Sequence, residues 1–175
     1  MHVLVAYGSK MGGTAGIAEL IGDALTDAGL QADVRPVAEV SQLDRYDAVV
    51  IGGALYTGHW HRQARRFVRR HTDALRERPV WLFSSGPIGT MATKHEPVEP
   101  KGVTAIRRAL SPQDHRVFFG AWDRSKLDRS KLGFAERIVA KRLPQGDFRD
   151  WAAIEAWADG IARELAHRSA SRRGG

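Results

Sequence analysis

Hydroxyl and glycine residues gather in a short loop near the N-terminus, between an apolar run at 3–7 and a segment with helical periodicity. The loop consists of Ser9, Lys10, Met11, Gly12, Gly13 and Thr14. Glycines let backbone N–H groups approach an anion, hydroxyls donate hydrogen bonds to it, and the positive end of a helix attracts it. The loop has neither the Gly-Lys-Ser/Thr ending of a Walker A loop nor the Gly-x-Gly-x-x-Gly dinucleotide spacing. We predict a phosphate site here, although a plain glycine-rich turn would have the same composition.

Aromatic side chains and glycines follow the most apolar run, 48–52, in a second loop. This loop consists of Ala54, Leu55, Tyr56, Thr57, Gly58, His59 and Trp60. Flat ligands bind between apolar or aromatic walls, with a few backbone donors at the ring edge. Tyr56 and Trp60 therefore suit a ring slot, although both would also suit a core position beside the next helix.

Two further segments follow apolar runs, and we expect both at the same edge of a sheet. The first is a tight loop that would form the opposite wall of the slot: Ser85, Gly86, Pro87, Ile88 and Gly89. The second is the pair Trp122 and Asp123, of which the indole is expected to line the pocket. Trp81 and Trp151 are expected in the core.

Two histidines in this region, His59 and His61, lie two residues apart without a carboxylate cluster nearby. Metal binding needs a fuller ligand set, so we predict no metal site. His59 suits a hydrogen-bond donor or proton relay beside a ring, whereas His61 is expected to cap a helix or lie at the surface. No acid–base pair stands out, so we assign no catalytic residue.

Short apolar runs alternate with helical periodicity, which predicts an α/β fold with a parallel sheet. We expect strands at 3–7, 31–36, 48–52, 80–84 and 116–121, with 31–36 at an edge because Pro36 cannot donate to a ladder. Gly29 is expected to end the first helix and Asp150 to cap the last one. The doubly wound order 2-1-3-4-5 would place ligands outside the carboxyl ends of strands 1 and 3. We expect one domain over 1–168, a basic helical insert before the last helix, and a disordered tail over 169–175.

The amino-acid composition excludes several kinds of reactive group and binding site. The 175 residues include no cysteine, which excludes disulfides, thiol nucleophiles and cysteine-ligated clusters, so redox chemistry needs a cofactor. No apolar run approaches the roughly 20 residues of a membrane-spanning helix, and the first strand leaves no room for a signal peptide. We therefore expect a cytoplasmic protein. The net charge of +7 favours anionic partners.

A basic segment at 126–143 concentrates part of this charge. As a helix it would place apolar residues on one face and basic residues elsewhere, which is typical of a helix lying on a membrane surface. A helix packed on the protein with a solvated basic face would show the same pattern.

The loop at 9–14 resembles the phosphate loop of flavodoxins. The stretch 46–61 ends in Gly-Gly-Ala-Leu-Tyr-Thr-Gly-His-Trp-His, and it is similar to the menaquinone-dependent protoporphyrinogen dehydrogenase branch of that family. The similarity continues through Phe-Val-Arg-Arg-His at 67–71 and resumes with Gly-Asp-Phe-Arg-Asp-Trp at 146–151. The resemblance implies a flavodoxin-like fold and flavin mononucleotide (FMN) as cofactor.

The same resemblance implies an oxidoreductase that oxidises a porphyrinogen-like substrate with a quinone-like acceptor, at the inner face of a membrane if 126–143 touches lipid. Two alternatives keep the fold: a flavodoxin-type electron-transfer protein, and a protein that uses a deazaflavin. Small electron-carrier flavodoxins are typically acidic, so the charge of +7 favours the enzyme. Nucleic-acid binding lacks a recognition motif or an array of stacking aromatics.

Overall fold

The computed structural model describes residues 1–9, 12–56, 58–86, 100–122 and 146–173. Its sheet contains five parallel strands in the order β2-β1-β3-β5-β6. These strands are β1 (His2–Gly8), β2 (Gln31–Pro36), β3 (Ala48–Tyr56), β5 (Val80–Ser85) and β6 (Asp114–Phe118). The short strand β4 (His59–Trp60) pairs with the end of β3, and β7 (Ala121–Trp122) pairs with β8 (Gly146–Asp147). The predicted order of the five main strands is confirmed, since β4 is a hairpin addition.

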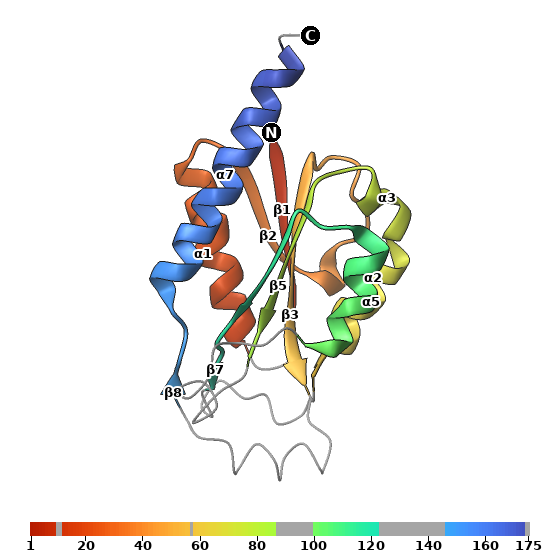
Figure 1. Ribbon diagram of the computed structural model, residues 1–175, viewed down its shortest axis with the longest axis vertical. Helices are drawn as coiled ribbons and strands as arrows, with labels where there is room; N and C mark the ends of the chain where they lie inside the picture. The colour runs from red at the N-terminus through yellow and green to blue at the C-terminus, as the bar shows by residue number, and fades with distance from the viewer. Residues whose placement is uncertain (10–11, 57, 87–99, 123–145, 174–175) are drawn as a thin grey trace.

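Helices cover both faces of the sheet (Figure 1). One face carries α1 (Gly13–Asp27) and α7 (Trp151–Arg173), and the other carries α2 (Arg62–Arg70), α3 (Thr72–Arg76) and α5 (Thr104–Leu110). Two 3-10 turns, η1 (Val37–Glu39) and η2 (Lys101–Val103), complete the described elements. Alternating strand residues point to opposite faces, so Val3 and Val5 pack under α1 and α7 while Leu4 and Ala6 pack under α2. Both faces of the sheet are therefore buried, as a parallel sheet requires.

Local signals in the sequence explain where the elements end. Gly29 has φ +83° just after α1, and Leu30 N–H donates to Leu25 O over 3.0 Å, which closes the helix. Asp150 caps α7, because its Oδ1 accepts the Ala153 N–H over 3.0 Å. β2 lies at the edge of the sheet, as expected from Pro36.

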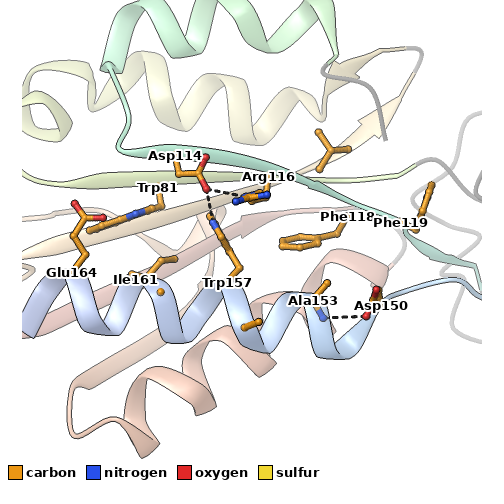
Figure 2. A pocket seen from close by; sticks show the side chains of 13 residues that line it. Trp81, Asp114, Arg116, Phe118, Phe119, Asp150, Ala153, Trp157, Ile161 and Glu164 are labelled. Carbon is orange, nitrogen blue, oxygen red and sulfur yellow. Dashed lines mark hydrogen bonds and ion pairs between the residues drawn. The ribbon is translucent and has the colours of Figure 1, made fainter. Parts of the chain in front are cut away.

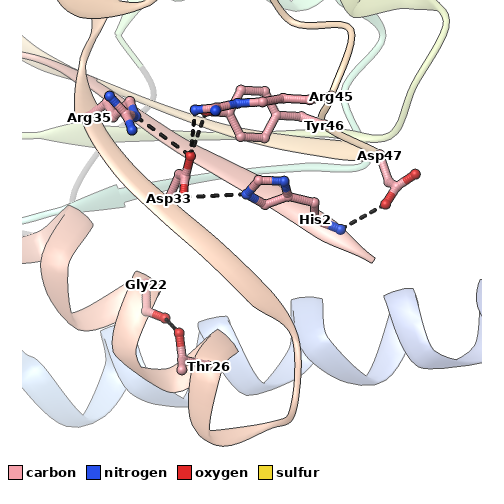
Figure 3. A network of polar contacts seen from close by, with 8 residues as sticks. All are labelled: His2, Gly22, Thr26, Asp33, Arg35, Arg45, Tyr46 and Asp47. Atoms are coloured by element: carbon pink, nitrogen blue, oxygen red, sulfur yellow. Dashed lines mark hydrogen bonds and ion pairs between the residues drawn. The ribbon is translucent and has the colours of Figure 1, made fainter.

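The amino ends of the first three strands are held in register by a polar network (Figure 3). Asp33 accepts hydrogen bonds from Tyr46 Oη and Arg45 Nη2, both over 2.8 Å, and pairs with His2 Nε2 at 3.3 Å. Burial raises the pKa of Asp33, but the hydrogen bonds from Tyr46 and His2 outweigh it and leave the pKa below its usual value. Asp47 accepts the His2 N–H over 2.7 Å. The network fixes the end of the sheet opposite the predicted ligand edge.

Several expectations about the elements need correction. The apolar residues at 64–75 recur at the spacing of a single helix, but the segment forms two helices, because His71 leaves helical geometry with φ −112° and ψ 18°. The last sheet strand begins at Asp114 rather than at 116, and Ala121 belongs to the separate strand β7.

Corrections also apply to Trp151 and to the C-terminus. Trp81 is buried as expected, but Trp151 is 41% exposed. It lies at the start of α7, where the Arg149 guanidinium stacks on its ring. α7 continues to Arg173, where we had expected a disordered tail from residue 169. The expected basic insert, including 126–143, lies outside the described residues.

Candidate functional site

The carboxyl ends of β1, β3 and β5 bring the three predicted loops to one edge of the sheet. Gly8 lies opposite Gly53, which lies opposite Ser84, so the three strands end in one row. The glycines permit close packing there. A Cβ on Gly8 would lie 2.8 Å from Ala64 Cβ on α2. This edge is where the strand order reverses, between β1 and β3, and doubly wound folds bind ligands at that point.

The described part of the predicted phosphate loop leads through Gly12 into the N-terminus of α1. Gly12 has φ +76° and forms the N-cap of α1, and a Cβ placed on it would have no heavy atom within 4 Å. Thr14 follows in the first turn of α1 and is 1% exposed, while Ser9 precedes the loop and is half-buried. Ala15 N–H donates to Gly12 O over 3.0 Å. The positive end of a helix dipole attracts negative charge at this terminus. Lys10 and Met11 lie outside the described residues.

The second predicted loop is a β-hairpin formed by the end of β3 and by β4. Leu55 pairs with Trp60, Tyr56 pairs with His59, and Gly58 takes φ +77° at the tip. Ala54 O accepts the His61 N–H over 2.9 Å, which closes the hairpin at its base. Thr57 lies outside the described residues.

A third segment braces the tip of this hairpin. Gly102 N–H donates to Gly58 O over 3.2 Å, and a Cβ on Gly102 would lie 2.5 Å from the His59 ring. The hairpin is thus supported from both its base and its tip. Such support matters for a ligand edge, because donors held in place need no ordering when a ring binds.

Trp60 lies beneath the hairpin, with 1% of its surface exposed. Its indole covers Gly53 so closely that a Cβ there would lie 2.3 Å from the ring. The indole N–H donates to Ser84 Oγ over 2.7 Å, and Ser84 Oγ also lies 2.9 Å from His115 Nε2 on β6. This chain of hydrogen bonds ties the hairpin to two strands of the sheet. The structure therefore gives Trp60 an anchoring position, and its contact with a ring stays a prediction.

Tyr56 lies nearer the tip of the hairpin and is half-buried. Its ring is edge-on to that of His61, with 5.8 Å between the centroids. His61 is the N-cap residue of α2, as expected, but only 8% of it is exposed. His59 is exposed next to the tip.

The third predicted loop begins at the end of β5. Ser85 is 6% exposed, and Gly86 takes φ +130°, close to Leu55 of the hairpin. Gly86 N–H donates to Phe118 O over 2.9 Å, which directs the chain across the end of β6. Pro87, Ile88, Gly89 and Asp123 lie outside the described residues, and Trp122 is described only as part of β7.

Arg149 joins this edge although the sequence analysis assigned it no role. Its Nη1 donates to Gly13 O over 3.4 Å, its guanidinium stacks on Trp151 at 4.1 Å, and it pairs with Asp147 at 2.6 Å. The guanidinium therefore lies against the first turn of α1, where an anion is expected. The sequence gives no sign of this contact, because 136 positions separate Arg149 from Gly13 and only the packing of α7 beside α1 brings them together.

A groove of about 700 Å³ lies elsewhere, between β6 and α7 (Figure 2). Trp81, Phe118 and Trp157 contribute aromatic walls, and Asp114 accepts hydrogen bonds from Trp157 Nε1 over 2.8 Å and Arg116 Nε over 2.9 Å. Burial raises the pKa of Asp114, but these hydrogen bonds outweigh it and hold the pKa below its usual value. The polar groups bond to one another, so they do not converge on a ligand.

The described residues contain neither a metal-ligand cluster nor a membrane-spanning helix. No group of three or more His, Cys, Asp or Glu side chains is arranged to hold a metal in the described ranges. Among the helices of the described part, none is long and apolar enough to cross a membrane.

The arrangement of this edge agrees with the comparison to known families. Residues 4–146 match the flavodoxin domain family, and the chain belongs to that family. Membership of this family and the similarity to flavodoxin structures imply a flavin cofactor.

Individual relatives agree with this assignment. The chain is 27% identical over 180 residues to protoporphyrinogen IX dehydrogenase [quinone] of Escherichia coli, covering 95% of this chain and 96% of that one. An archaeal flavodoxin superposes with a TM-score of 0.65 at 15% identity, covering 95% of this chain and all of the other. Rubredoxin oxygen:oxidoreductase of Desulfovibrio gigas superposes with a TM-score of 0.63 at 12% identity, with 97% of this chain matching 37% of it. These structures show the same fold.

Proposed function

We propose that the chain is an FMN-dependent oxidoreductase. One observation carries this proposal: an open, left-handed Gly12 at the start of α1 lies at the same sheet edge as a hairpin braced at its base and its tip. The first feature suits a phosphate and the second suits the edge of a ring, so together they fit a phosphorylated flavin. When bound, a flavin accepts reducing equivalents from an organic substrate and passes them to an acceptor.

Each part of the edge has a separate task in this proposal. The first turn of α1, with Ser9 and Thr14, would bind the phosphate through hydroxyl and backbone donors. The hairpin at 54–60 and the loop at 85–89 would hold the ring between them and exclude water from its faces. Arg149 would strengthen the positive potential of the α1 terminus, although Asp147 neutralises part of its charge.

A porphyrinogen-like substrate and a quinone-like acceptor are the reactants we propose. They are supported by the E. coli relative, a protoporphyrinogen IX dehydrogenase [quinone], which aligns over 95% of this chain. The net charge of +7 would also favour a substrate that carries carboxylates. Contact of the segment 126–143 with the inner face of a membrane belongs to the same proposal, because it would bring the flavin near a lipid-dissolved acceptor.

The phosphate assignment can be tested by a pair of substitutions, Ser9→Ala with Thr14→Val. Hydrogen bonds to charged groups contribute about 1.5–3 kcal/mol each, so we expect FMN affinity to fall about a hundredfold or more. Riboflavin has the same ring without the phosphate, and its affinity should change little. Ser41→Ala with Thr26→Val, at two exposed hydroxyl residues outside the three predicted loops, is the matched control. Equal losses for FMN and riboflavin would contradict the assignment.

Substrate turnover separates the enzyme from an electron carrier. The FMN-loaded chain should oxidise protoporphyrinogen in the presence of a menaquinone analogue, followed by the fluorescence of the porphyrin formed. A chain that binds FMN but turns over only with an added reductase would instead be an electron-transfer protein. If the chain preferentially retained a deazaflavin, recognised by its altered absorption, the cofactor would be a deazaflavin rather than FMN.

A further inference from the structure

Helix α2 presents a continuous arginine surface. Arg62, Arg65, Arg66, Arg69 and Arg70 are all exposed on its nine residues, and α2 contains no acidic residue. At about 100° per residue the five guanidiniums fall within an arc of roughly 140°. The apolar residues of the helix, Ala64, Phe67 and Val68, lie on the opposite side and are buried against the sheet. We call these five arginines the α2 face.

The charges of the α2 face are not neutralised within the protein. None of the five arginines forms an ion pair with a carboxylate in the part of the chain that the structure describes. Exposed Arg76 on α3 and Arg108 on α5 extend the positive surface, with Asp73 as the acidic residue of α3. The potential reaches the adjacent His71, whose pKa is lowered first by burial and then by the charge of Arg70.

On the opposite side of the sheet, α1 is acidic, whereas α7 beside it carries both acidic and basic residues. Helix α1 exposes Glu19, Asp23 and Asp27 and contains no basic residue. Because α1 and α2 lie on opposite faces of the sheet (Figure 1), these two helices form a dipole across it. If the charged side chains served only solubility, acidic and basic residues would not be separated onto two different helices. A dipole of this kind orients the protein as it approaches a charged partner.

The α2 face also lies beside the proposed flavin site. His61, which ends the hairpin, is the N-cap residue of α2, and Ala64 packs against Gly8 at the end of β1. A partner on α2 would therefore contact the hairpin that we expect to hold the ring.

We propose that the α2 face is the docking surface for an acidic, one-electron carrier protein that exchanges electrons with the bound flavin. In this exchange the reduced carrier loses one electron and the flavin gains it. The proposal rests on the proposed flavin site and adds a protein partner to the small-molecule reactants.

The chemistry of the α2 face favours a protein over other polyanions. Helices that lie in a membrane insert an apolar face, but the apolar residues of α2 are already buried in the core. Binding of single-stranded nucleic acid relies on stacking aromatics, and the one large apolar side chain exposed in the described ranges, Trp151, lies on α7. Transient redox complexes have small, charged interfaces, and a nine-residue helix of about 13 Å is of that scale. Guanidiniums also pair bidentately with carboxylates.

The test compares two triple variants with the same net charge, using a plant-type [2Fe–2S] ferredoxin as the acidic probe. Arg65→Gln, Arg66→Gln and Arg69→Gln alter the α2 face, and Arg116→Gln, Arg163→Gln and Arg168→Gln alter β6 and α7. Each lowers the net charge from +7 to +4, that is 7 − 3. All six side chains lie at the surface, and thermal unfolding verifies that both variants fold.

Binding of labelled ferredoxin is measured first on the flavin-free chain, by fluorescence anisotropy. We expect the α2 triple variant to weaken binding about tenfold or more at low salt, and the control triple to stay within about threefold of the unmodified chain. With FMN bound, the rate of reduction by reduced ferredoxin, followed by stopped flow, should fall in the same pattern. In the α2 triple variant, that rate should change less with salt concentration than it does in the unmodified chain.

Specific outcomes would overturn the proposal. Equal effects of the two triples would show that net charge matters and the α2 face does not. Loss of binding to phosphatidylglycerol vesicles in the α2 variant, with ferredoxin binding unchanged, would assign the face to lipid. If the chain retained no flavin but still bound ferredoxin through α2, the docking surface would stand and the proposed function would fail.

Discussion

Replacing Ser84 with alanine would remove the hydrogen-bond acceptor of a buried indole. Trp60 Nε1–H donates to Ser84 Oγ over 2.7 Å, and the two residues are 1% and 0% exposed, so water cannot replace the lost partner. An unsatisfied buried donor costs about 1–3 kcal/mol. We expect Ser84→Ala to lower the free energy of unfolding by about 2 kcal/mol, which shifts Tm by roughly 4–8 °C in a chain of this size.

Urea unfolding of a double-mutant cycle measures this effect. Trp60→Phe removes the donor, so Ser84→Ala on that background should cost much less than it does alone, with a coupling of about 1–2 kcal/mol. Ser41→Ala, at an exposed serine, should change stability by less than about 0.5 kcal/mol. Losses that simply add, or a Ser84→Ala variant as stable as the unmodified chain, would refute the anchoring role of this hydrogen bond.

The same substitution has a signature in ligand binding. The hairpin is expected to face the ring, so Ser84→Ala should weaken FMN and riboflavin to the same degree. This pattern differs from that of Ser9→Ala with Thr14→Val, which should weaken FMN alone. An effect of Ser84→Ala on FMN without one on riboflavin would contradict the division of the edge into a ring site and a phosphate site.

Two other substitutions and a pH profile test the packing described above. Gly53→Ala should destabilise by about 3 kcal/mol, because its Cβ would lie 2.3 Å from a buried indole ring. Gly160→Ala, with no atom within 4 Å, should stabilise α7 by roughly 0.5–1 kcal/mol; similar urea midpoints for the two variants would contradict the geometry. Burial raises the pKa of Asp114, but its hydrogen bonds leave that pKa below the ordinary value. The ionised carboxylate therefore stabilises the fold above about pH 4, and the stabilisation is lost as pH falls through the folded-state pKa. In Asp114→Asn, the free energy of unfolding should fall less steeply as the pH is lowered below about 4. If the steepness did not change, Asp114 would not contribute to the pH dependence of stability.

The strand order and the meeting of the three loops at one edge of the sheet were predictable because apolar runs and glycine positions are local signals. The short apolar runs at 48–52 and 80–84 favoured buried strands, and the loop with Gly12 directly follows the run at 3–7. The cap at Asp150 and the helix end at Gly29 were equally readable, because each depends on residues within one turn.

What the sequence could not show depends on contacts between distant residues. The position of Trp60 depends on Ser84 and His115, which lie 24 and 55 residues further along the chain. Arg149 reaches Gly13 only because α7 packs beside α1. The break between α2 and α3 has no proline or glycine to mark it, and it falls on His71, whose ring packs on Phe67 at 4.8 Å.

The measurement that tests the central claim most directly is a titration of the purified chain with FMN, followed by absorbance and by quenching of flavin fluorescence. The proposed site predicts saturation at one equivalent, and retention of the flavin bands after excess FMN is removed. A chain that neither quenches nor retains FMN would contradict the proposed function.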